Sequence, residues 1–298
     1  MAQIENAPLV FINRVAKHKP ENIRHTEGYC PFCHPETLTD VLREDGERIW
    51  LVNKYRTLAD TMQTIVVESA DHEGDFSNYT PAESEVVLRF SLECWGQMLR
   101  DARYRSVLMY KNYGPLSGGS IRHPHLQIVG LTEKDGYERV PANAFGGVEV
   151  VREGGREVCL STHPLMGFME TNASVPETGD AALMAPGDVV WLSGVIRKVA
   201  RYLLERYHGH GCTSYNLFFY RTEDTGAAGE SGAVDGGTGA ADGSGAVDGG
   251  TPAHRIVAKI VPRWVASPYF VGYRISQVDC DETLQAVAAE MREVLPEG

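Results

Sequence analysis

The amino-acid sequence predicts an α+β protein in which one antiparallel unit occurs twice. The order helix, strand, loop, strand appears in both halves of the chain, with the matching strands starting at residues 106 and 213. A length of 298 residues allows one large domain or two small ones. We therefore expect two similar halves, 1–140 and 141–298, each an antiparallel sheet covered by a helix.

In the first half, short runs rich in β-branched, aliphatic and aromatic residues predict strands. These runs are Leu9–Asn13, Ile49–Lys54, Gln63–Glu68, Ser106–Asn112 and His123–Gly130. Thr80 followed by Glu83 is typical of a capping box, and Pro81 suits a first helical turn. A helix is therefore expected from Thr80 to about Asp101. The glycine-rich segment Tyr113–Ser120 predicts a loop between the last two strands.

The second half follows the same order. Gly187–Trp191 leads into a helix expected over about Leu192–Tyr207. Thr213–Tyr220 and His254–Pro262 predict the two matching strands, and Asp281–Val294 predicts a C-terminal helix. In the place of the first half's glycine-rich loop stands a Gly/Ala/Asp-rich insertion, residues 225–252.

The insertion 225–252 differs in composition from the rest of the chain. It holds ten of the 31 glycines, no Lys, Arg or aromatic residue, and the octet SGAVDGGT twice. Such a segment buries too little apolar area to offset the entropy of ordering it. We therefore expect a disordered surface insertion, which a folded domain tolerates well.

Composition and charge exclude several classes of protein. The chain carries 28 Lys+Arg and 40 Asp+Glu, a net charge of −12. Because neutralising a nucleic-acid backbone needs clustered cations, no nucleic-acid polymer is expected as a partner. No apolar run approaches the roughly 20 residues of a membrane span, and residues 1–15 lack the pattern of a secretory signal. A cytoplasmic protein is the expectation.

The densest chemistry lies in the segment Asn112–Gln127, which contains a Gly/Ser loop followed by His-Pro-His-Leu-Gln. On a strand, His123, His125 and Gln127 would all face one side of the sheet. The glycines before them let backbone N–H groups approach an anion. Imidazole, amide and loop together suit phosphoryl chemistry with a histidine nucleophile. The alternative is a polar, exposed strand face with no catalytic role.

Cys30 and Cys33 form the one closely spaced pair among six cysteines, as Cys-Pro-Phe-Cys. This spacing supplies two soft ligands for tetrahedral zinc, which needs two further nitrogen or sulfur ligands. The alternative is a redox pair. A redox pair usually opens a helix, and Pro35 close behind Cys33 makes that less natural.

Together these residues resemble the galactose-1-phosphate uridylyltransferase-like branch of the histidine-triad (HIT) superfamily. That branch carries an Asn, a Gly/Ser loop and His-Pro-His-x-Gln, as the segment Asn112–Gln127 does. Val52–Tyr55, Glu68–His72 and the stretch from Pro262 to Tyr273 are also similar to parts of it. The resemblance implies a duplicated HIT-like fold, as a homodimer or as a duplicated chain that mimics one.

The resemblance also supplies metal ligands. It adds His72 and His123 to Cys30 and Cys33, which completes a Cys2His2 set for structural zinc. A closed four-ligand sphere leaves no open position for a catalytic water. The metal would instead fix the backbone beside His125.

The reaction implied is nucleotidyl transfer through a covalent nucleotidyl-histidine. His125 would attack the α-phosphorus of a nucleoside diphosphate-sugar or dinucleoside polyphosphate, and a phosphorylated acceptor or phosphate would then take the nucleotide. The other ring nitrogen would hold its proton toward the carbonyl of His123. Gln127 and Ser120 would donate hydrogen bonds to phosphate oxygens. The residues expected to bind the nucleotide or its phosphates are Asn53, Lys54, Tyr55, Asn112, Gly118, Gly119 and Arg122.

Three departures from the uridylyltransferase pattern leave the substrate open. Val257–Lys259 stands where a second His-x-His would hold a second metal, so that second site is expected to be absent. Arg274 stands where galactose-handling members carry an acidic residue, and Leu126 is similar to the phosphorylase branches. An ADP-sugar or diadenosine polyphosphate phosphorylase or hydrolase is therefore one alternative. A non-catalytic nucleotide-binding zinc protein is another.

Overall fold

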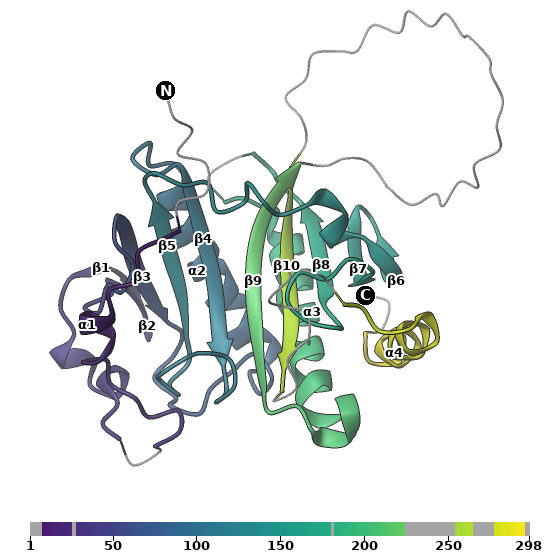
Figure 1. Ribbon diagram of the computed structural model, residues 1–298, viewed down its shortest axis with the longest axis horizontal. Helices are drawn as coiled ribbons and strands as arrows, with labels where there is room; N and C mark the ends of the chain where they lie inside the picture. The colour runs from purple at the N-terminus through teal and green to yellow at the C-terminus, as the bar shows by residue number, and fades with distance from the viewer. Residues whose placement is uncertain (1–7, 26–27, 180–181, 224–253, 265–276, 296–298) are drawn as a thin grey trace, which may run out of the picture.

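The computed structural model describes residues 8–25, 28–179, 182–223, 254–264 and 277–295. The insertion 225–252 and the turn containing Arg274 lie outside these residues. Within them, the strands form one antiparallel sheet of ten, in the order β1-β2-β3-β5-β4-β9-β10-β8-β7-β6 (Figure 1). None of the described helices is long and apolar enough to cross a lipid bilayer.

The sheet consists of two halves with mirrored strand order. The first half contains β1 (Val41–Asp45), β2 (Arg48–Val52), β3 (Thr61–Val67), β4 (Ser106–Tyr113) and β5 (His125–Leu131). The second half contains β6 (Gly147–Glu153), β7 (Arg156–Ser161), β8 (Thr171–Pro176), β9 (Ser214–Glu223) and β10 (His254–Arg263). The predicted duplication of an antiparallel α+β unit is confirmed. The halves do not form separate sheets, because β4 and β9 pair along the midline from Met109 opposite Phe219 to Tyr113 opposite Tyr215.

Two long helices cover one face of the sheet. They are α2 (Pro81–Leu99) and α3 (Pro186–Glu205), which lie side by side behind the strands in Figure 1. The predicted capping box begins α2: the Thr80 side chain accepts from the Glu83 N–H, and the Glu83 carboxylate accepts from the Thr80 N–H. The helix α4 (Asp281–Val294) packs at the far edge, against β6 and β7. A single turn, α1 (Asn13–Ala16), lies near the N-terminus.

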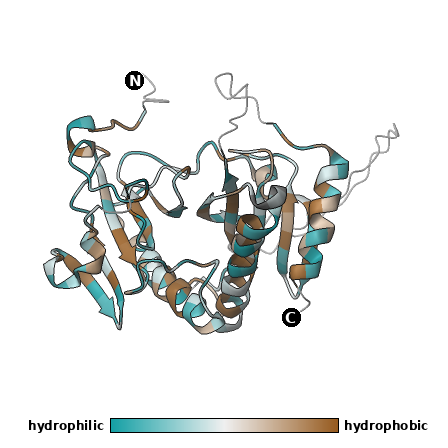
Figure 2. Cartoon of the chain, turned by 90° about the horizontal axis from the view of Figure 1, so that it is seen from below, coloured by the Kyte–Doolittle hydropathy of each residue, from teal (hydrophilic) through white to brown (hydrophobic). Residues whose placement is uncertain are grey.

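The main core lies between the helices and the sheet. It contains Phe90 and Trp95 of α2 together with Leu126 and Ile128 of β5, all nearly inaccessible to solvent. Figure 2 shows hydrophobic residues gathered where the helices meet the strands. A second, smaller apolar cluster lies on the first half of the sheet and includes Cys30 and Phe32. The Cys-Pro-Phe-Cys segment therefore packs against the sheet by burying its own phenylalanine.

Several elements differ from the sequence expectations. Leu9–Asn13 is not a strand, because only Phe11 bridges to Leu58 and α1 begins at Asn13. Gly187–Trp191 is already the start of α3. The sequence predicts no strand at β1 or at β6–β8. All five residues of β1 are exposed, and β8 buries the small or polar run Thr-Asn-Ala-Ser, so neither carries the apolar alternation of a typical strand.

Candidate functional site

The site begins where β5 begins, at His125. Leu126 and Ile128 point into the helix-side core, so alternation places His125 and Gln127 on the opposite, open face of the sheet. The expectation that His123 shares the strand is wrong, because β5 starts two residues later. Pro124 has no N–H to give to the ladder, and its carbonyl accepts from the Glu68 N–H at 3.1 Å. His123 lies fully buried just before the strand.

The ring of His125 has a defined orientation. Its Nδ1 lies 2.9 Å from the carbonyl oxygen of His123. A carbonyl can only accept, so Nδ1 carries the proton and the lone pair is on Nε2. The Phe32 ring packs against the imidazole at 5.4 Å between centroids. Burial lowers the pKa of His125 to about 4, against the opposing effect of the His123 bond, so the imidazole is neutral at neutral pH.

Gln127 faces Tyr110 across the β4–β5 pair. The Tyr110 hydroxyl donates to Oε1 of Gln127 at 3.2 Å. Burial raises the pKa of Tyr110 to about 12, so the hydroxyl keeps its proton. Because the amide oxygen is occupied, the amide NH2 of Gln127 is left to donate on the open face.

The glycine-rich loop has a conformation that requires glycine. Gly114 has φ +81°, and a Cβ there would lie 2.3 Å from the carbonyl oxygen of Thr213. Gly118 also has a positive φ, of +87°. The loop is partly bonded to itself and to β9: the N–H of Leu116 donates to Ser214 Oγ and that of Gly119 to Ser117 Oγ. Fewer of its N–H groups remain for an anion than the sequence suggests.

Arg122 and Ser120 occupy the end of this loop. The Arg122 guanidinium lies 2.8 Å from the Glu73 carboxylate and packs over the Tyr113 ring at 5.0 Å. Its charge is therefore already paired. The Ser120 carbonyl accepts from the N–H of Asn22 at 2.9 Å. Both residues lie beside the His-Pro-His segment, and their expected contacts with phosphate stay predictions.

Asn53, Lys54 and Tyr55 follow the end of β2, away from His125. The Asn53 N–H donates to the carbonyl of Gln63, which faces Val129 on β5. Val129 is four residues beyond His125, a separation of about 13 Å along a strand. The structure does not bring this segment against the imidazole. Its contact with the nucleoside stays a prediction.

The four expected metal ligands do come together. The ligand atoms of Cys30, Cys33, His72 and His123 all lie within 4.8 Å of one another. Cys33 Sγ is 3.2 Å from His72 Nδ1 and 3.4 Å from His123 Nδ1. Bond lengths of tetrahedral zinc imply separations between ligand atoms of about 3.3–3.8 Å. The set therefore fits a tetrahedral metal ion.

The surroundings of the cluster also suit a metal. His123 Nε2 lies 2.8 Å from the carbonyl of Ser69, which directs Nδ1 toward the two thiols. His34 is not part of the cluster: its side chain is 49% exposed and stacks on Tyr29. With two imidazoles beside the two thiols, this arrangement favours a metal site over a redox pair.

A buried charge network lies on the helix side, beneath the His-Pro-His segment. Lys111 pairs with Glu68 and lies 3.4 Å from Asp75, and all three side chains are almost inaccessible. Tyr79 donates to Glu68 at 3.1 Å, and Tyr215 donates to Asp75 at 2.8 Å. The network joins β3, β4 and β9 to the loop that carries His72. Sequence reasoning missed it because Lys111 and Tyr215 are distant in sequence from the segment that holds Glu68, Asp75 and Tyr79.

Lys19 is a second residue that sequence reasoning missed. Burial lowers its pKa, and no carboxylate in the described part of the chain pairs with it. Its positive charge is also among the causes that lower the pKa of His125. A half-buried lysine whose charge acts on His125, and which has no carboxylate partner among the described residues, is suited to contact an anion. No motif in the sequence surrounds it.

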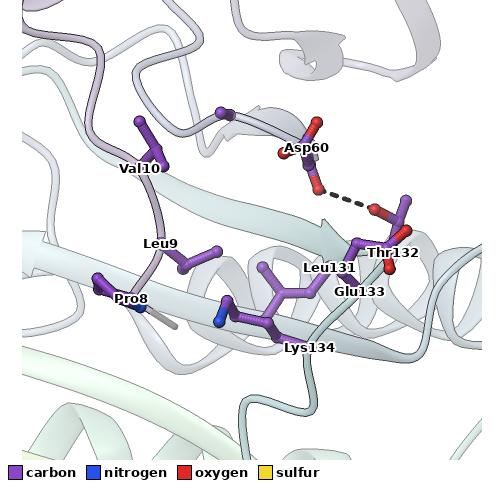
Figure 3. Close-up of a pocket in the computed structure, with 9 residues that line it drawn as sticks. Pro8, Leu9, Val10, Asp60, Leu131, Thr132, Glu133 and Lys134 are labelled. Atoms are coloured by element: carbon purple, nitrogen blue, oxygen red, sulfur yellow. Dashed lines mark hydrogen bonds between the residues drawn. The ribbon is translucent and has the colours of Figure 1, made fainter. Parts of the chain in front are cut away.

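The described surface also has a small hollow of about 50 Å³, shown in Figure 3. Pro8, Leu9 and Val10 form one wall, and residues from Leu131 to Lys134 form another. Thr132 Oγ1 donates to the Asp60 carbonyl at 3.0 Å. Leu131 is six residues from His125, about 20 Å along β5. The hollow is therefore at the opposite end of the strand from the candidate site.

The chain has a GalT-like fold, which solved structures of other proteins share. Solved uridylyltransferase structures share the fold at 14% identity and a TM-score of 0.60, over 90% of this chain and 92% of the other. An ADP-glucose phosphorylase from Arabidopsis thaliana shares it at 14% identity and a TM-score of 0.62, over 89% and 90% of the two chains.

The chain belongs to the DUF4931 family. Its residues 11–134 match the N-terminal domain of this family, a domain of unknown function, and residues 137–228 match the C-terminal domain. The crystal structure of a DUF4931 family protein from Bacillus cereus is 31% identical, with a TM-score of 0.66, over 87% of this chain and all of the other.

One curated relative is also similar in sequence. Diadenosine 5',5'''-P1,P4-tetraphosphate phosphorylase 2 from Saccharomyces cerevisiae is 30% identical over 121 residues. This match covers 39% of the present chain and 36% of the relative. The likeness therefore spans about a third of that enzyme's length.

Proposed function

We propose that this protein is a nucleotidyltransferase that forms a covalent nucleotidyl-histidine on His125. The donor is a nucleoside diphosphate-sugar or a dinucleoside polyphosphate, and the acceptor is phosphate or a phosphorylated compound. The observation that carries the proposal is the fixed tautomer of His125, whose Nδ1 is bonded to the His123 carbonyl at 2.9 Å. Among the described residues, no hydrogen-bond donor occupies the other ring nitrogen, Nε2.

The reaction has two displacements. In the first, the lone pair of Nε2 forms a bond to the α-phosphorus, and the bond from that phosphorus to the bridging oxygen breaks. The leaving group departs with the electron pair as a sugar phosphate or a nucleoside polyphosphate. In the second, a phosphate oxygen of the acceptor attacks the same phosphorus, the P–N bond breaks, and His125 is restored.

The groups around His125 would stabilise the charge on the phosphoryl oxygens. Gln127, held by Tyr110, offers its amide NH2 beside the imidazole. Asn112 and the N–H groups of Gly118 and Ser120 would be further donors. Lys19 would supply the positive charge that Arg122, paired with Glu73, does not.

Zinc is the metal that the Cys2His2 set suits best. Cys30, Cys33, His72 and His123 would hold it, and with four protein ligands it would act as a structural ion. The residues that hold the ion would then serve to position His125. The His123 side chain is held by the cluster while its carbonyl orients His125.

A phosphorylase is the second candidate, in which inorganic phosphate is the acceptor. The curated relative from S. cerevisiae is named as a diadenosine tetraphosphate phosphorylase, and Leu126 of this chain points to the same branch. UDP-glucose:hexose-1-phosphate uridylyl transfer is the candidate that the branch name suggests. A homodimer is a further part of the proposal, by analogy with the superfamily.

The test is a donor panel with a covalent readout. The protein is incubated with UDP-glucose, ADP-glucose or diadenosine tetraphosphate, each labelled at the α-phosphate, and is then denatured and separated on a gel. We expect acid-labile, base-stable label on the wild type and none on His125→Gly. Release of the label by phosphate or by a sugar phosphate identifies the acceptor. A folded wild type that binds these nucleotides and takes no label from any of them would instead be the non-catalytic binding protein.

A further inference from the structure

We propose that Asn216, on the second half of the sheet, is a positioning residue that fixes which end of the Asn112 amide faces the substrate. The inference rests on the proposed function of the first half. Asn112 on β4 and Asn216 on β9 face each other across the midline pair. Nδ2 of Asn216 donates to Oδ1 of Asn112 at 2.6 Å.

The orientation of both amides follows from a third group. Nδ2 of Asn216 also donates to the carbonyl oxygen of Ser117 at 3.0 Å. A backbone carbonyl can only accept, so Asn216 must present its NH2 to Ser117. The same NH2 faces Asn112, so Asn112 must present its oxygen in return. Its own NH2 is then left without a partner among the described residues.

The consequence is that two amides of the site offer donors and no acceptor. Asn112 and Gln127 are both amides that could present either an oxygen or an NH2 group. In each case a neighbour occupies the oxygen: Asn216 does so for Asn112, and the Tyr110 hydroxyl for Gln127. Two NH2 groups then remain for phosphoryl oxygens, which accept hydrogen bonds and cannot donate them when ionised.

Asn216 belongs to a short run of β9 that contacts the first half at three points. Ser214 Oγ accepts from the N–H of Leu116 in the glycine-rich loop, at 3.0 Å. The Tyr215 hydroxyl donates to Asp75, in the loop that carries His72. Asn216 contacts Asn112 and Ser117. The second half thus shapes a site whose reacting residues all come from the first.

The test separates positioning of Asn112 from general loosening of the loop. Asn216→Leu removes the donor, and Ser214→Ala loosens the same loop without touching Asn112. Each is combined with Asn112→Ala, and kcat/KM with the labelled donor is measured for singles and doubles. We expect Asn216→Leu to lower kcat/KM about tenfold, but less than about twofold once Asn112 is alanine. The effect of Ser214→Ala should be equal in both backgrounds.

Asn216→Asp is the sharper variant, because it keeps the shape and replaces the NH2 with a carboxylate oxygen. That oxygen repels Oδ1 of Asn112, so the amide turns and presents an acceptor to the phosphate. We expect Asn216→Asp to lower kcat/KM more than Asn216→Leu does. We also expect it to weaken the binding of AMP and UMP, measured by calorimetry. Additive effects of Asn216→Leu and Asn112→Ala would overturn the proposal.

The calorimetric readout distinguishes this inference from the proposed function. If the wild type binds AMP or UMP but forms no covalent label, the catalytic proposal fails. The positioning of Asn112 is then judged from the same double-mutant comparison on the affinity for AMP or UMP. If the wild type neither binds nor labels, both proposals are overturned. Thermal unfolding of each variant shows that a loss does not come from a misfolded protein.

Discussion

The carbonyl oxygen of His123 lies 2.9 Å from Nδ1 of His125. The side chain of His123 is one of the four cluster ligands, and its Nε2 is bonded to the Ser69 carbonyl. One residue therefore joins the candidate metal site to the candidate nucleophile, by its side chain on one side and its backbone on the other. Losing the metal should disturb both stability and chemistry.

We expect Cys33→Ala to abolish metal binding and to lower the melting temperature. Metal binding to a closed site of this kind contributes directly to the free energy of folding. Metal content by elemental analysis and thermal unfolding, with and without chelator, measure the effect. His34→Ala is the matched control, since this neighbouring imidazole points away from the cluster and should leave both unchanged. If Cys33→Ala had the same melting temperature as the wild type measured without chelator, a structural role for the metal would be contradicted.

Tyr110→Phe removes the hydroxyl that orients Gln127. We expect a five- to tenfold fall in kcat, about the effect of one hydrogen bond, with little change in the melting temperature. Tyr137→Phe serves as the comparison, because its hydroxyl donates to the Val107 carbonyl, three residues before Tyr110 on β4. That variant should lose stability and keep kcat. Equal kcat values for Tyr110→Phe and the wild type would show that Gln127 needs no such support.

Lys19→Gln should weaken binding of a polyphosphate donor, because it removes a half-buried cation that acts on His125 and has no carboxylate partner among the described residues. The expected change is a rise in KM of about tenfold, the effect of a charge-assisted hydrogen bond, and it should shrink with added salt. Lys17→Gln changes the same charge at an exposed position two residues away. If both variants raise KM equally, the effect is one of overall charge.

Lys111→Met leaves two buried carboxylates, Glu68 and Asp75, without their cation. Burial already raises the pKa of Glu68, and Lys111 opposes that shift. We expect the free energy of unfolding to fall by about 3–5 kcal/mol in urea titrations. Adding Glu68→Gln to Lys111→Met should restore part of the lost free energy of unfolding. No loss in the single variant would mean that the lysine charge does not support the network.

The capping box gives a prediction with a pH dependence. Hydrogen bonds with Thr80 lower the pKa of Glu83 in the folded protein. A lowered folded pKa means that the carboxylate stabilises the fold above its unfolded pKa of about 4.3 and loses that effect in acid. Thr80→Ala should cost about 1 kcal/mol of unfolding free energy at pH 7. Urea unfolding should show that the free energies of unfolding of Glu83→Gln and the wild type become more similar as the pH falls below 4.

The strands and helices with strong local signals could be predicted from the sequence. The Thr80–Glu83 box placed the start of α2, and α4 has the predicted bounds Asp281–Val294. The missed strand β8 lacks such a signal. In β8 the residues facing the core are small or polar, such as Ala173 and Thr171, and their burial depends on the neighbouring strands.

The same distinction applies to the candidate site: some of its residues could be predicted from the sequence and others could not. His125 and Gln127 share one motif, and Cys30 and Cys33 form a closely spaced pair. The resemblance added His72 and His123, and the structure brings these four cluster residues together. Asn216 and Lys19 lie in no motif, and their importance comes only from the strand pairing and burial around them. The pairing of Arg122 with Glu73 could not be predicted either, because it depends on where the loop that carries His72 lies.

The register of β9 and β10 has a practical consequence for the chain's unusual insertion. Glu223 and His254 are paired neighbours, so the described residues on either side of the insertion lie at adjacent points of the sheet. Ser214, at the other end of β9, contacts the glycine-rich loop. The pair Glu223–His254 therefore lies at the end of these two strands that is farther from the candidate site. It is the place in this protein where a reporter domain or an affinity tag could be inserted while the candidate site stays intact.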